Sequence, residues 1–157
     1  MTEPRTPIRV LFVCTGNSAR SQMAEAITAD LGGPAFDVHS AGTHPGTVNP
    51  LTIRVLSEIG IDWSSARSKS VGVYLDQSFD DVITVCDQAR EACPVFPGGR
   101  ASLHWGFEDP AAAVGTDAER LAVFRRVRDE IRASVARFIE AAVGTTFRET
   151  VAPETGA

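Results

Sequence analysis

The feature that most constrains the fold of this chain is an apolar run that leads through a loop of small residues into a helical pattern. The run covers residues 8–13, follows Pro7 and is rich in branched side chains, so we expect a buried strand. From Met23 to Leu31, apolar residues recur at helical spacing until Gly32-Gly33 stops the pattern. A strand, loop and helix in this order direct backbone N–H groups and a helix N-terminus at an anion. The loop reads Cys14-Thr15-Gly16-Asn17-Ser18-Ala19-Arg20-Ser21.

Each residue type in this loop has a chemical use at an anion site. We expect Gly16 and Asn17 to adopt the positive φ angles that let successive N–H groups converge. Those donors and the helix dipole are expected to lower the pKa of the Cys14 thiol, while the Ser21 hydroxyl donates to its sulfur. The planar Arg20 guanidinium suits two oxygens of a tetrahedral anion. The alternative is a buried cysteine at a strand end beside a solvated arginine.

Residues 14–25 resemble the signature loop of the low-molecular-weight tyrosine phosphatase superfamily, and the resemblance extends over roughly residues 8–142. That superfamily contains phosphatases and thioredoxin-coupled arsenate reductases on one fold. The resemblance implies that Cys14 is the nucleophile. It also implies that the oxyanion is bound by the loop residues Thr15, Gly16, Asn17, Ser18, Ala19, Arg20 and Ser21.

Two further cysteines, Cys86 and Cys93, complete the thiols of the chain. Cys86 follows the apolar run 82–85 and should emerge at the same sheet edge as Cys14. If residues 86–93 were helical, the α-carbons of the two cysteines would lie about 10 Å apart, whereas a disulfide needs about 4.4–6.8 Å. The segment must unwind before they can join, which predicts a redox switch, although free cysteines are also common as small core residues. Their spacing does not fit a zinc site.

The same resemblance indicates which branch of the superfamily this chain follows. Cys86 and Cys93-Pro94 look like the second and third cysteines of the thioredoxin-coupled arsenate reductases. Ala19 stands where many members have another cysteine, which favours Cys86 as the thiol that resolves Cys14. Asp109-Pro110 looks like the general-acid segment, with Glu108 as a rival. Residues 111–113 are alanines where phosphatases usually carry a tyrosine pair that stacks on aryl substrates.

We therefore expect an arsenate reductase that uses Cys14, Arg20, Cys86, Cys93 and Asp109. Thioredoxin is the expected electron donor, with no metal or organic cofactor, and phosphate and sulfate are expected to compete with arsenate. The residues alone do not distinguish thioredoxin from a low-molecular-weight thiol. One alternative is a phosphatase that uses only Cys14, Arg20 and Asp109. Another is a non-catalytic module that binds oxyanions or senses redox state.

The rest of the sequence predicts a single flavodoxin-like α/β domain over residues 7–143. Its parallel sheet would have four strands, with helices on both faces. After the first strand at residues 8–13, the other three are expected at residues 36–40, 82–85 and 101–105. Asn49-Pro50 should open a helix whose inward residues are Ile53, Leu56 and Ile59. Thr116 and Glu119 form a capping box for the longest helix, and residues 1–6 and 144–157 are expected to be flexible.

The net charge and the hydropathy of the chain limit the classes of partner that we expect for it. The net charge of −5 argues against general nucleic-acid binding. We find no secretory signal or long apolar span, and expect a cytoplasmic monomer. His104 is expected to make structural hydrogen bonds. The remaining basic residues are expected to be solvated: Arg67, Lys69, Arg125, Arg126, Arg128 and Arg132.

Overall fold

The structure is a computed structural model, and it describes residues 6–94 and 101–151. Within these residues, four parallel strands form one sheet in the order β2-β1-β3-β4, which confirms the predicted α/β class. The strands are β1 (Ile8–Cys14), β2 (Phe36–Gly42), β3 (Asp81–Thr84) and β4 (Ala101–His104). The helices are α1 (Arg20–Gly32), α2 (Pro50–Ser57), α3 (Asp87–Ala92) and α4 (Asp117–Val151). Three short 3₁₀ helices are η1 (Gly33–Ala35), η2 (Val71–Tyr74) and η3 (Pro110–Ala112).

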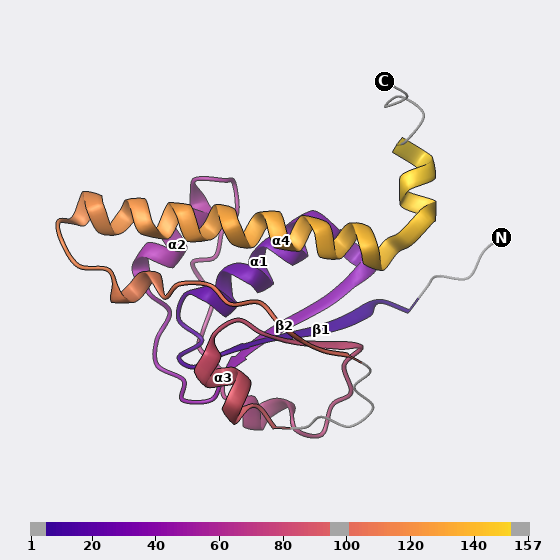
Figure 1. The fold of residues 1–157 in the computed structure, drawn as a ribbon, viewed down its shortest axis with the longest axis horizontal. Coiled ribbons are helices and arrows are strands. Elements are labelled where there is room, and N and C mark those ends of the chain that lie inside the picture. The colour runs from indigo at the N-terminus through magenta and orange to yellow at the C-terminus, as the bar shows by residue number, and fades with distance from the viewer. Residues whose placement is uncertain (1–5, 95–100, 152–157) are drawn as a thin grey trace.

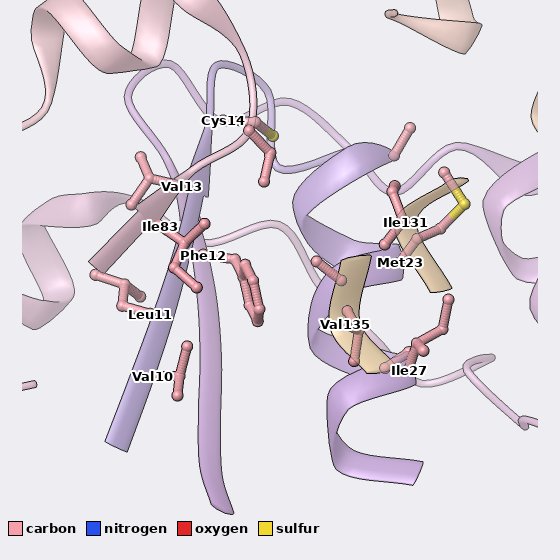
Figure 2. Packing of buried hydrophobic residues seen from close by; sticks show 14 of the residues in the cluster. Val10, Leu11, Phe12, Val13, Cys14, Met23, Ile27, Ile83, Ile131 and Val135 are labelled. Atoms are coloured by element: carbon pink, nitrogen blue, oxygen red, sulfur yellow. The ribbon is translucent and has the colours of Figure 1, made fainter. Parts of the chain in front are cut away.

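Strand β1 forms the centre of the core because it has a hydrogen-bonded neighbour on each side and carries branched or aromatic residues on both faces. Its residues 10–13 are completely buried. Figure 2 shows Phe12 pointing toward α1 and α4, where the apolar stripes of those helices meet it, whereas Leu11 and Val13 lie on the other side of the strand. The stripe residues labelled there are Met23, Ile27, Ile131 and Val135.

The helices cover both faces of the sheet. In Figure 1, α1, α2 and α4 lie on one side of the labelled strands, and α3 lies on the other. Helix α1 packs against α4 and β2, and α3 packs against β1 and β3. Parallel strands joined by such crossovers bring their carboxyl ends to one edge. Cys14 ends β1 there, and Cys86 follows the end of β3 by two residues.

Both predicted helix starts are confirmed. The Asn49 side chain accepts from Leu51 N at 2.9 Å, and Pro50 is the first helical residue of α2. At the start of α4, Thr116 N donates to Glu119 Oε1 at 2.8 Å, and Glu119 N donates to Thr116 Oγ1 at 3.1 Å.

Some burial predictions were wrong. In α2 the completely buried residues are Thr52, Val55 and Leu56, so Leu56 is buried as expected. Ile53, and Ile59 beyond the end of the helix, are only partly buried, because the helix turns Thr52 and Val55 inward beside Leu56. Leu31 is exposed at the end of α1. Arg128, expected on a solvated face, is buried and donates to Val55 O at 2.9 Å.

Helix α4 continues to Val151, so the expected domain boundary at residue 143 falls inside a helix. Residues 1–5 and 152–157 lie outside the described residues, and the flexibility expected of the two ends stays a prediction. No helix in the described part of the chain combines the length and the apolar character needed to cross a membrane.

Candidate active site

The loop after β1 is held by hydrogen bonds to the outer side of its backbone. Its first five carbonyl oxygens each accept from a group beyond the loop. The pairs are Cys14 O with Thr43 N (3.1 Å), Thr15 O with His44 N (2.8 Å), Gly16 O with Gly46 N (3.0 Å), Asn17 O with Ser68 Oγ (2.7 Å) and Ser18 O with Asn49 N (3.1 Å). A trans peptide points its N–H opposite to its C=O, and no described peptide is cis. The loop N–H groups therefore face inward, where an anion would sit.

Asn17 is the centre of the loop. Its φ is 49°, in the left-handed region that asparagine tolerates better than most residues. Its side-chain Oδ1 accepts from Lys69 N at 2.8 Å and from Gln22 Nε2 at 2.9 Å. Its Nδ2 donates to Ser21 Oγ at 2.8 Å and to Ser40 Oγ at 2.9 Å. Four side-chain contacts thus fix the turn from both sides.

The sulfur of Cys14 lies at the base of this loop with two polar neighbours. Ser21 Oγ is 2.8 Å away, and Asn17 N donates to the sulfur at 3.2 Å. Because Ser21 Oγ already accepts from the Asn17 amide, its own proton is available for the Cys14 sulfur. Both contacts direct a donor at the sulfur.

A mostly buried carboxylate supports the loop from behind. Ser40 Oγ donates to Glu25 Oε1 at 2.6 Å, and Lys69 Nζ lies 3.7 Å from the same oxygen. Burial raises the pKa of Glu25 above its ordinary value, while the hydrogen bond from Ser40 and the charge of Lys69 act against that rise. Lys69 was expected at the surface, but its backbone N–H donates to Asn17 and its ammonium lies beside Glu25.

Two glycines near the loop, Gly16 and Gly42, have roles that the sequence did not predict. Gly16 does not adopt a positive φ, so Asn17 alone provides the left-handed turn of the loop. Gly42 at the end of β2 was not singled out from the sequence, yet a Cβ there would lie 2.5 Å from Thr15 O and 2.9 Å from Asn17 N. The absence of a side chain at Gly42 lets the strand end approach the loop.

Arg20 and Asp109 come together at the open side of the loop. Arg20 Nη1 donates to Phe107 O at 3.1 Å, and its Nη2 lies 3.7 Å from Asp109 Oδ2. The Arg20 side chain is only 12% exposed, so it is not the solvated arginine of the alternative interpretation. Asp109 Oδ1 accepts from Ala111 N at 3.0 Å, which fixes the carboxyl at the start of η3.

Glu108, the rival of Asp109, has a different partner. Arg126 Nη2 on α4 donates to Glu108 Oε1 at 2.6 Å. This contact holds the Glu108 carboxylate against α4, whereas the Asp109 carboxylate lies beside Arg20. Of the two carboxylates, only that of Asp109 lies beside the Arg20 guanidinium, and its role as the acid stays a prediction.

The second cysteine lies beside the loop. Cys86 is buried, and its Sγ is 3.3 Å from Thr15 Oγ1. Cys93 is partly buried at the far end of α3, and burial raises the pKa of its thiol, so this conformation favours the protonated form. All three cysteines are free thiols, with the short helix α3 between the second and the third. Residues 87–92 are helical while Cys86 and Cys93 are free thiols, and the redox switch expected from their spacing stays a prediction.

A cleft of about 590 Å³ opens beside Arg20 and passes between α3 and the segment before η3. Two carboxylates of α3 and the Arg20 guanidinium give it a mixed charge. It is lined by Arg20, Asp87, Gln88, Glu91, Gly106 and Phe107. Among the described residues, no group of three or more His, Cys, Asp or Glu side chains has an arrangement that could hold a metal ion.

Comparison with known proteins places the chain. Residues 9–149 match the family described as low molecular weight phosphotyrosine protein phosphatase. The chain belongs to this family. Within the family, it is 47% identical over 131 residues to an arsenate reductase of Halalkalibacterium halodurans, a match that covers 83% of this chain and 94% of the relative.

Solved structures of family members agree with the fold. An arsenate reductase in its oxidised state superposes with a TM-score of 0.74 at 32% identity, covering 87% of this chain and 98% of the other. A thioredoxin-dependent arsenate reductase from Corynebacterium glutamicum gives a TM-score of 0.63 at 30% identity, covering 87% of this chain and 64% of the other.

Proposed function

We propose that this chain reduces arsenate to arsenite, with Cys14 as the nucleophile and with Cys86 and Cys93 as a thiol relay. The observation that carries the proposal is the 3.3 Å separation between Thr15 Oγ1, in the anion loop, and Cys86 Sγ. It brings a second sulfur to the loop that holds the first. A phosphatase of this family has no need of that sulfur, because water releases its product. The similarity to arsenate reductases supports the same choice.

In the first step, the inward N–H groups of residues 15–19 and the Arg20 guanidinium bind arsenate. The Cys14 thiolate attacks arsenic, with Ser21 donating to the sulfur until the attack begins. An S–As bond forms, an As–O bond breaks, and Asp109 protonates the departing oxygen, which leaves as water. The contact between Asp109 and Arg20 keeps the acid beside the anion.

In the second step, the Cys86 thiolate attacks the Cys14 sulfur of the adduct. The S–As bond breaks with its electron pair on arsenic, so arsenic is reduced from the pentavalent to the trivalent state and leaves as arsenite. The two sulfurs are left as a Cys14–Cys86 disulfide. Cys93 then attacks Cys86 and Cys14 departs as a thiolate, which leaves a Cys86–Cys93 disulfide. Helix α3 must unwind for this last bond.

We propose thioredoxin as the dithiol that reduces Cys86–Cys93, as the name of the Corynebacterium glutamicum relative suggests. The steps above use only side chains of this protein and a dithiol donor, so no resident metal or organic cofactor enters them. Phosphate and sulfate have the shape and charge to compete for the loop. We also propose that the protein is cytoplasmic and that it acts as a monomer.

The test is NADPH consumption by the purified protein with thioredoxin and thioredoxin reductase, with and without arsenate. The wild-type protein should oxidise NADPH only when arsenate is present. The Cys93→Ser variant should stop after about one turnover per enzyme, and Cys86→Ser should not release arsenite.

Aryl phosphate hydrolysis by the same variants provides the control. Hydrolysis that survives Cys86→Ser, in a protein whose arsenate-dependent oxidation is lost, supports the relay. Arsenate-dependent cycling that survives both substitutions would overturn the relay. Steady hydrolysis without any arsenate-dependent oxidation would point to a phosphatase with two spectator thiols.

A further inference from the structure

Helix α3 is fastened to the sheet by a side-chain contact at its first residue. Asp87 Oδ1 lies 2.9 Å from His104 Nε2, and His104 Nδ1 lies 2.8 Å from Thr84 Oγ1. Thr84 and His104 are opposite each other in the register of β3 and β4. The contacts therefore run from the edge of the sheet to the residue directly after Cys86.

The distances favour one direction of donation along this chain. Thr84 Oγ1 is 2.8 Å from His104 Nδ1 but 3.4 Å from Leu103 O. The Thr84 hydroxyl is therefore better placed to donate its single proton to the ring nitrogen than to the carbonyl. With Nδ1 accepting, the ring proton is on Nε2 and is donated to Asp87. The side chain of His104 is 21% exposed, whereas that of Asp87 is 85% exposed. Asp87 can therefore be replaced without disturbing the core.

The contact matters because α3 separates the two cysteines of the relay. In the reduced form, Arg90 N donates to Cys86 O at 3.1 Å, which closes the first turn of the helix. A disulfide between Cys86 and Cys93 requires the α-carbons to approach from about 10 Å to about 4.4–6.8 Å, so this turn has to open. Asp87 is the first residue of this turn, so its contact with His104 belongs to the helical form.

We infer that Asp87 and His104 form a latch that stabilises the helical dithiol form of residues 86–93 relative to the looped disulfide form. The inference rests on the proposed relay and adds to it a pair of positioning residues that set the redox balance of its last two thiols. Loss of the latch should make the Cys86–Cys93 disulfide easier to form and harder to reduce.

The test measures the dithiol–disulfide equilibrium of Cys86 and Cys93 in the full-length chain carrying Cys14→Ser. The protein is equilibrated at one pH in glutathione buffers, where glutathione disulfide takes two electrons and two protons from the pair. Asp87→Ala should shift the equilibrium constant about fivefold toward the disulfide. That change lowers the midpoint potential by about 20 mV, at 29.6 mV per tenfold change.

Two further variants separate the latch from the charge. Asp87→Asn keeps an oxygen that accepts from His104 but removes the carboxylate charge, and should remain within about twofold of the parent. Glu91→Ala removes another α3 carboxylate of the same cleft, one with no hydrogen bond to any residue that the structure describes, and should leave the potential unchanged.

The outcomes distinguish the latch from the relay. An Asp87→Ala potential equal to that of the parent, or an equal shift in Asp87→Asn, would overturn the latch and leave the relay standing. If Cys86 and Cys93 form no disulfide in any buffer, the relay fails and the latch fails with it.

Discussion

Asn17 is the residue on which the geometry of the anion loop most depends. It combines a left-handed backbone with four side-chain hydrogen bonds in a completely buried position. We expect Asn17→Ala to lower the free energy of unfolding by about 3 kcal/mol, because buried donors and acceptors lose their partners and alanine disfavours this φ. We also expect arsenate-dependent kcat/KM to fall about 100-fold as the inward N–H groups lose their alignment.

The companion variant Asn17→Gly keeps the backbone freedom and loses only the side chain. It should recover part of the stability but little of the activity, since the contacts to Ser21 and Ser40 are missing in both variants. Urea denaturation and steady-state kinetics measure the two quantities. Equal activity in Asn17→Gly and the wild-type protein would show that the side-chain contacts are dispensable.

Ser21 has a more specific role, because its proton is directed at the Cys14 sulfur. Removing the hydrogen bond from Ser21 to the Cys14 sulfur in Ser21→Ala should slow iodoacetamide alkylation of Cys14 about tenfold. The thiol alkylated can be identified by mass spectrometry. Ser57→Ala, at an exposed position of α2, serves as the control, and an unchanged alkylation rate in Ser21→Ala would contradict the assignment.

At the scale of elements, the end of β2 limits how the loop can sit. A methyl group at Gly42 would overlap Thr15 O and Asn17 N, so Gly42→Ala should cost about 2 kcal/mol of stability and reduce activity. Gly46→Ala is the matched control, because its added Cβ meets nothing within 4 Å. Thermal unfolding and arsenate-dependent NADPH oxidation compare the two, and equal losses in both variants would contradict this explanation.

Most elements could be predicted from the sequence, because strands and helices leave local periodic signals. The capping box at Thr116 and the N-cap at Asn49 are examples, since both depend on residues two or three positions apart. The face of α2 was predicted only in part, because the position of α4 decides it: Leu56 is buried as expected, whereas Thr52 and Val55 are buried in place of Ile53 and Ile59. Nothing within α2 shows that Val55 O should accept from Arg128.

The candidate site divides in the same way. The residues of the loop itself could be proposed from their types and spacing, as could Cys86 from its place after a strand, whereas Asp109 was preferred to Glu108 on the family resemblance. The residues that hold the loop in place could not. Ser40 and Lys69 reach Asn17 from 23 and 52 positions away, and no local pattern records such contacts.

At the scale of the whole molecule, Glu58 joins the end of α2 to α4. Hydrogen bonds from Arg125 lower the pKa of Glu58 to about 2, and Arg128 adds to the effect. The unfolded chain has the ordinary value of 4.5, so this stabilisation is fully present above about pH 4.5 and is lost as the pH falls toward 2.

Glu58→Gln should therefore be less stable than the wild-type protein by about 1 kcal/mol at pH 7, with the difference closing toward pH 2.5. Urea unfolding at several pH values measures this difference. Glu130→Gln removes an exposed pair within α4 and should change stability by less than about 0.5 kcal/mol. A Glu58→Gln deficit that did not depend on pH would contradict the role given to its charge.

The outward tethering of the loop carbonyls also determines where selectivity can arise. Donors whose positions are set before any ligand arrives respond to size, charge and tetrahedral shape, and in these respects phosphate and arsenate are nearly alike. The two differ only afterwards, because thiols reduce pentavalent arsenic and do not reduce phosphate. The thiol steps that follow binding thus discriminate arsenate from phosphate. Abundant phosphate slows the enzyme by occupying the loop, but it does not consume the reducing equivalents of the thiols.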